Sequence, residues 1–152
     1  MIREATKKDL STVLSFYIKI LKHTKKYDKN VSLKDKDAIR DDIVYELKKR
    51  NHIVLIALED KQPIGCICVS VHKGYGWNIH KKYAYINWTY VDKNHRRKNI
   101  ANQLTEQSLK LAKEKGATTC FAGVDLGNDD GFNFWPKIGF KKHNIEFERE
   151  IK

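Results

Sequence analysis

The spacing of apolar residues changes along this chain, and that change constrains the fold more than any other feature. After Thr6 and Asp9, which resemble a helix start, apolar residues recur three and four positions apart. They are Leu10, Val13, Leu14, Tyr17, Ile18 and Leu21. A second helical pattern uses Ile39, Ile43, Val44 and Leu47. The chain therefore begins with two predicted helices, the second ending near Arg50.

From residue 53 the pattern becomes one of short runs rich in β-branched residues. The runs 53–58 and 64–71 flank a polar turn and predict a hairpin, and residues 83–91 predict a third strand. Helical spacing returns at Ile100, and Gly116 is expected to end that helix in a left-handed conformation. With a strand at 118–125, this part of the chain predicts a strand, crossover helix, strand unit.

The last third adds a short helix and a final strand. Residues 129–138 predict the helix, and a strand follows in which Ile145, Phe147 and Ile151 share a parity. One more short strand is expected at residues 2–5. The order ααβββαβαβ implies a mixed sheet with helices on both faces, within one domain of residues 1–152.

Composition narrows the function classes. The chain of 152 residues has a formal net charge of +11, which favours anionic ligands such as a phosphorylated cofactor. Nucleic acid is the less favoured alternative, because the lysines are scattered and form no basic tail. Cys66, Cys68 and Cys120 lack a Cys-x-x-Cys pair and predict reduced core thiols, so no metal is expected. With neither a signal peptide nor an apolar run of membrane length, we expect a cytoplasmic protein.

The segment 92–103 joins a predicted strand to a predicted helix through His95, Arg96, Arg97 and Lys98. A phosphate bound there would meet unpaired backbone N–H groups, the positive end of the helix dipole and several cationic side chains. The alternative is that these four basic residues are merely solvated. Spacing alone does not decide between the two.

Two motifs resemble the GNAT superfamily of N-acetyltransferases. The first, residues 96–101 (Arg-Arg-Lys-Asn-Ile-Ala), is similar to the family's Gln/Arg-x-x-Gly-x-Gly/Ala turn. The second, residues 128–140, is similar to the family's later Asn-x-x-Ala-x-x-Phe-Tyr-x-x-x-Gly-Phe segment. The resemblance implies an α/β (α+β) fold with a twisted, mostly antiparallel sheet of six to seven strands and about four helices.

The resemblance also implies a site for acetyl-CoA. The pyrophosphate would bind Arg96, Arg97, Lys98, Asn99, Ile100 and Ala101. The pantetheine arm would lie along the backbone of Tyr90 and Val91, with Asn128 and Trp135 on the far side. An amine of a small molecule or peptide would attack the acetyl carbonyl directly, in a monomer or homodimer.

Three residues depart from the family pattern. Asn99 replaces the usual glycine, and asparagine is the non-glycine residue that best tolerates a left-handed conformation. Trp135 stands where many members carry a tyrosine acid, and Tyr85 stands where some carry a glutamate base. Both remain candidate catalytic residues, although an indole cannot donate a proton as a phenol does. A non-catalytic acyl-CoA-binding domain is therefore an alternative.

Overall fold

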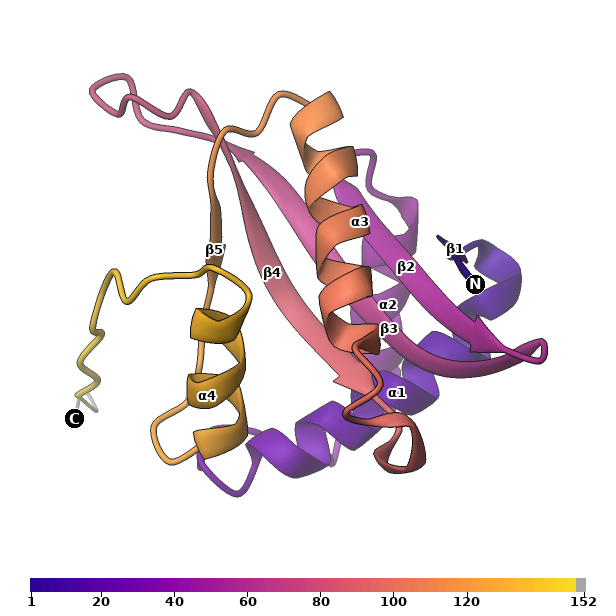
Figure 1. The fold of residues 1–152 in the computed structure, drawn as a ribbon. Helices are drawn as coiled ribbons and strands as arrows, with labels where there is room; N and C mark the ends of the chain where they lie inside the picture. The colour runs from indigo at the N-terminus through magenta and orange to yellow at the C-terminus, as the bar shows by residue number, and fades with distance from the viewer. Residues whose placement is uncertain (150–152) are drawn as a thin grey trace.

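The computed structural model describes residues 1–149 as a five-stranded sheet with helices on both faces (Figure 1). The strands, in their order across the sheet, are β1 (Ile2–Glu4), β2 (His52–Glu59), β3 (Gln62–Lys73), β4 (Lys82–Val91) and β5 (Cys120–Ala122). Strands β1 to β4 pair antiparallel, and β5 pairs parallel to β4. The expected mixed, mostly antiparallel sheet is confirmed.

Four helices cover the sheet, as expected. They are α1 (Leu10–Thr24), α2 (Lys36–Lys48), α3 (Ile100–Glu114) and α4 (Asp129–Lys137). Helix α3 crosses one face, α1 and α2 lie on the opposite face, and α4 lies beside β5 (Figure 1). The connection from β4 through α3 to β5 is the predicted crossover unit, and Gly116 ends α3 with a φ of 91°.

Each face of the sheet has its own hydrophobic core. Under α3, buried residues such as Leu55, Ile67 and Leu104 form one cluster. On the opposite face of the sheet, Val13 of α1 and Ile43 of α2 pack against apolar strand residues and form the second cluster. Strand β3 is buried along most of its length because its alternate side chains enter the two clusters. The sheet is therefore held from both sides.

The start of the first helix is fixed by the capping box that the sequence predicts. Thr6 and Asp9 cap each other's backbone around the 3-10 turn η1 (Lys7–Asp9), which leads into α1. Asp9 also accepts two hydrogen bonds from Arg3 in the middle of β1, at 2.9 and 2.7 Å. These contacts tie β1 to α1 and hold the pKa of the Asp9 carboxyl well below its usual range, chiefly through Arg3.

We expect Asp9→Asn to lower the free energy of unfolding at pH 7 by about 1 kcal/mol, allowing for solvent screening at the half-exposed Arg3. Because the folded pKa lies below the unfolded value, the stabilisation is present above about pH 4 and is lost as the pH falls further. Urea melts of both proteins at pH 7 and at pH 2.5 to 3 measure this difference, which should shrink in acid. Glu4→Gln, at an exposed position of the same strand, is the control. An equal loss at both pH values would contradict the ionic origin.

Strand β4 contains a bulge that changes which face its side chains occupy. Cys68 of β3 pairs with Trp88 but the next residue, Val69, pairs with Ile86, so Asn87 is the extra residue. Ala84 and Ile86 belong to the cluster under α3, whereas Trp88 belongs to the cluster under α1 and α2. The bulge lies in the strand that leads to residues 92–99, the basic turn before α3.

The expected strand count of six to seven is wrong for the residues described, which form five strands. Residues 141–149 are not a strand: Ile145 and Phe147 are 75% and 96% exposed, so their alternation does not reflect burial, and Ile151 lies outside the described residues. A strand needs a hydrogen-bonded neighbour, and residues 141–149 pair with none of the described strands. Strand β5 is also shorter than the predicted 118–125.

Among residues 1–149, no helix is both long and apolar enough to cross a membrane.

Candidate active site

The parallel pair of strands separates where the predicted cofactor segment begins. Strand β5 pairs with β4 from Ala84 to Ile86, and within the described chain the pairing extends no further, so residues 87–91 have no partner from β5. In Figure 1 the two strands meet near one end and diverge toward the end of β4. One edge of β4 is therefore available to a ligand between the bulge and the basic turn.

On the edge of β4 that β5 no longer covers, the backbone has an N–H group free to bind a ligand. Asp92 donates its N–H to Ile64 of β3 at 2.8 Å, so the N–H of the preceding residue, Val91, points to the opposite side. The ring of Tyr90 packs on Phe16 of α1, with centroids 5.2 Å apart. Val91 can thus offer its main-chain N–H to a ligand, whereas the main chain of Tyr90, which pairs with Cys66, faces β3 and its side chain belongs to the core.

The turn after β4 contains a row of unpaired backbone N–H groups. A 3-10 turn, η2 (Lys93–His95), follows Asp92, and α3 begins after Asn99. Arg97 and Asn99 both have left-handed φ values, 61° and 62°. The conformation expected of Asn99 is confirmed, whereas that of Arg97 was not predicted. Within residues 1–149, the N–H groups of residues 97–102 have no hydrogen-bond partner. Six consecutive donors at a helix N-terminus favour an anion.

The basic side chains of the turn are less free than the sequence indicates. Glu59 at the end of β2 pairs with His95 at 3.0 Å and with Lys98 at 3.6 Å. Arg96 donates its Nε to the carbonyl of Val91 at 3.1 Å, which closes the turn onto the strand. An anion bound here would therefore be held mainly by the backbone, and the exposed Arg97, which has no ion-pair partner in the described chain, would add a positive charge.

Helix α4 brings the second motif beside β5. Asn128 caps the helix by accepting the N–H of Gly131 at 3.2 Å. A Cβ at Gly131 would lie 2.9 Å from the Val124 side chain, so the glycine permits this close packing. Trp135 packs against the cluster under α3 and against Phe140, 5.1 Å away. Both sequence-predicted residues of this segment have structural contacts in addition to the cofactor role expected for them.

Tyr85 lies where β4 and β5 are still paired, opposite Phe121 and next to the separation point. A Cβ at Gly123 would lie 2.8 Å from its hydroxyl oxygen, so the glycine leaves room for the phenol at the end of β5. Burial raises the pKa of Tyr85, helped by the carboxylates Glu146 and Asp125. A phenol with a raised pKa stays protonated at neutral pH and can donate a proton, but it is a poor base.

Sequence reasoning missed a polar network below the bulge. Ser70 donates to Asn87 at 2.9 Å, Asn87 donates to the Cys68 sulfur at 3.5 Å, and the Trp88 indole donates to Glu46 at 3.0 Å. Burial is the main cause that raises the pKa of Glu46. A signal existed in the sequence, because Glu46 lies between Ile43 and Leu47 on the apolar side of the second helix pattern.

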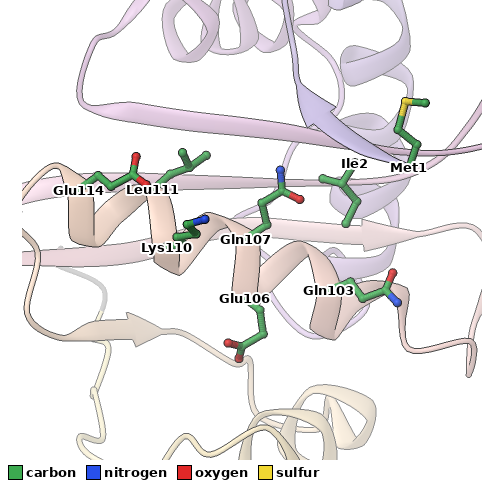
Figure 2. A pocket seen from close by; sticks show the side chains of 8 residues that line it. All are labelled: Met1, Ile2, Gln103, Glu106, Gln107, Lys110, Leu111 and Glu114. Carbon is green, nitrogen blue, oxygen red and sulfur yellow. The ribbon is translucent and has the colours of Figure 1, made fainter.

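Two hollows of the surface lie elsewhere, along the outer side of α3. One of about 650 Å³ lies between β1 and α3, and in Figure 2 the Gln107 side chain lies next to Ile2 there, whereas Glu106 points away from it. The other, of about 800 Å³, extends from Met1 and Arg3 to Lys98 at the turn. Neither is lined by β4, β5 or α4, so we do not place the reaction there.

Three features together are typical of an acetyltransferase fold: the bulge in β4, the separation of β4 from β5, and the unpaired N–H groups at the start of α3. Residues 17–140 match the Acetyltransferase (GNAT) family, and the chain belongs to this family. It is 24% identical, over 147 residues, to an uncharacterized N-acetyltransferase of Methanocaldococcus jannaschii. The match covers 95% of this chain but 62% of that protein, so this chain spans less than two thirds of its relative's length.

Solved structures share the fold at low sequence identity. The aminoglycoside 6'-N-acetyltransferase AAC(6')-Ig of Acinetobacter haemolyticus has a TM-score of 0.79 and 19% identity, with 100% of this chain and 99% of that chain covered. AAC(6')-Iy, solved in complex with CoA, has a TM-score of 0.78 and 16% identity with both chains fully covered. A mutant protein from Bacillus halodurans has a TM-score of 0.87 and 16% identity, with 100% and 99% covered.

Proposed function

We propose that residues 1–152 form one domain that transfers an acetyl group from acetyl-CoA to an amine. The row of unpaired N–H groups at residues 97–102 carries the proposal, because the negatively charged oxygens of a pyrophosphate would accept hydrogen bonds from these donors. Arg97 adds a positive charge, and residues 128–135 would line the far side. The open edge of β4 leads from this turn toward Tyr85, which is the direction that the extended arm of CoA would follow.

The transfer needs little from side chains. The acceptor nitrogen bonds to the carbonyl carbon, the bond from that carbon to sulfur breaks, and the electron pair leaves with the sulfur. A main-chain N–H on the open edge of β4 would polarise the carbonyl oxygen. The neutral Tyr85 hydroxyl would donate a proton to the departing thiolate, while the amine loses its own proton to water. Holding the two substrates in position supplies most of the rate.

The acceptor in this proposal is an amine of a small molecule or a peptide. Support comes from the shared fold with aminoglycoside acetyltransferases, one of which was solved with a bisubstrate analogue of CoA and acetylneamine. Calorimetry with acetyl-CoA tests the cofactor site. A thiol-release assay over a panel of polyamines, aminoglycosides and peptides then tests the transfer to an amine. Absence of heat at sub-millimolar acetyl-CoA would refute the cofactor site, and binding without thiol release from any amine would refute the transfer.

Tyr85→Phe is expected to lower kcat by about 10-fold while leaving the Kd for acetyl-CoA unchanged, because it removes a proton donor and keeps the ring. Steady-state thiol release and calorimetry measure the two quantities. Tyr83→Phe is the matched control, since Tyr83 lies two residues earlier on the same strand with its ring stacked on His72. Equal losses in the two variants would assign the effect to packing instead of proton donation.

A further inference from the structure

Beside the polar network below the bulge, three side chains place potential ligand atoms close together. Glu46 comes from α2, His52 from the start of β2 and Cys68 from the middle of β3. One ligand atom from each lies within 4.8 Å of the other two, and Cys68 is fully buried. We propose that Glu46, His52 and Cys68 form a Zn²⁺ site on the face of the sheet under α2, a function separate from acetyl transfer.

The donor types select the metal. Thiolate, imidazole and carboxylate are the three side-chain groups that bind zinc in proteins. A thiolate and an imidazole disfavour Mg²⁺ and Ca²⁺, which take oxygen ligands. Three protein ligands leave the fourth tetrahedral position for a water molecule. The spacing in sequence did not suggest this site, because His52 and Cys68 are neighbours only across the β2–β3 pairing.

An unpaired imidazole nitrogen points to a missing partner. The Nδ1 atom of His52 is buried, and in the described part of the chain it has no hydrogen-bond partner. A buried polar atom without a partner is costly, and a metal ion would satisfy it. Burial is the main cause that lowers the pKa of His52, and this favours the neutral ring that coordinates a metal.

The other two ligands already have outer partners of the right kind. The Trp88 indole N–H donates to Glu46 at 3.0 Å, and the Asn87 amide donates to the Cys68 sulfur at 3.5 Å. Donors of this sort orient anionic ligands and stabilise their charge around a metal. Burial is the main cause that raises the pKa of both groups. A divalent cation that bound here would displace the proton of the Cys68 thiol.

The geometry requires only a small adjustment. Zinc bonds of 2.0 to 2.3 Å place tetrahedral ligand atoms about 3.5 Å apart, so any two of the three ligand atoms would approach each other by about 1.3 Å at most. Glu46 and His52 are partly exposed and have room to rotate. The ion would link α2 to β2 and β3 directly below Asn87, the bulge residue of β4.

Titration of the untagged, chelator-treated protein with Co²⁺ tests the site, because Co²⁺ replaces Zn²⁺ and reports its ligands by absorption. We expect one equivalent to bind with a thiolate-to-cobalt charge-transfer band, which one equivalent of Zn²⁺ then abolishes. A Zn²⁺ excess of about 100 times Kd should raise the melting temperature by several degrees. No thiolate band at millimolar Co²⁺ would overturn the proposal.

Cys66 provides a matched control for Cys68, since it lies two residues earlier on the same strand and is equally buried. Cys68→Ser should abolish the charge-transfer band, and Cys66→Ser should keep it. If Cys68→Ser does not fold, His52→Gln should weaken Co²⁺ binding by about 10-fold or more. A band that is unchanged in His52→Gln, or that survives in Cys68→Ser, would overturn the assignment.

Discussion

Replacing Asn99 by valine is expected to raise the Kd for acetyl-CoA by about 30-fold, which corresponds to about 2 kcal/mol. Asn99 has a φ of 62° at the residue immediately before α3. A β-branched residue strongly disfavours this left-handed conformation, so the free variant should relax away from it. Binding must then restore the conformation, because the positions of the N–H groups of residues 97–102 depend on the shape of this turn.

Asn99→Gly is the control for this effect, since glycine adopts the same φ without strain. We expect it to bind acetyl-CoA within about threefold of the wild type. Calorimetry gives both constants, and melting temperatures show whether either variant has lost its fold. If Asn99→Val binds as tightly as Asn99→Gly, the left-handed turn is not part of the cofactor site.

Replacing Leu104 by alanine is expected to lower the free energy of unfolding by about 3 kcal/mol and the melting temperature by about 10 °C. Leu104 is fully buried in α3 and belongs to the cluster under that helix. Removing its side chain leaves a cavity between α3 and the sheet, and the neighbouring strands fill it only partly. The helix that carries the proposed pyrophosphate site depends on this contact for its anchoring.

Glu106→Ala serves as the comparison, because Glu106 is exposed on the same helix. This substitution should lower the free energy of unfolding by less than about 0.5 kcal/mol. Urea denaturation measures both variants. Acetyl-CoA binding by Leu104→Ala, measured well below its melting temperature, should stay within a few-fold of the wild type, since no donor of the turn is removed. A loss below about 1 kcal/mol would contradict the assignment of Leu104 as the anchor of α3.

The sequence predicted the regions where local chemistry decides the conformation. Thr6 and Asp9 cap the first helix, Gly116 ends the third, and Asn99 adopts a left-handed conformation. Each of these outcomes depends on the steric and hydrogen-bonding preferences of a residue and its immediate neighbours. The order of the two motifs was likewise sufficient to identify the acetyltransferase family, which the match over residues 17–140 confirms.

The sequence was wrong where pairing with a distant segment decides the outcome. The alternation of Ile145 and Phe147 predicted a strand, but no described strand pairs with that segment. Strand β5 is short because its pairing with β4 ends at Ile86, immediately before the β4 bulge at Asn87. A bulge and a strand separation depend on contacts between residues far apart in the chain, which periodicity does not report.

The basic turn illustrates both contributions. The left-handed conformation of Asn99 was predicted from the sequence, whereas that of Arg97 was not. Only the structure shows that Lys98 and His95 pair with Glu59, so that an anion bound at the turn would depend mainly on the backbone. The convergence of Glu46, His52 and Cys68 is likewise tertiary, since α2, β2 and β3 bring them together. Sequence by itself determined the helix caps, the conformation of Asn99 and the family of this protein. The tertiary structure decided which charges are neutralised and which donors face one another, because those depend on distances across the fold.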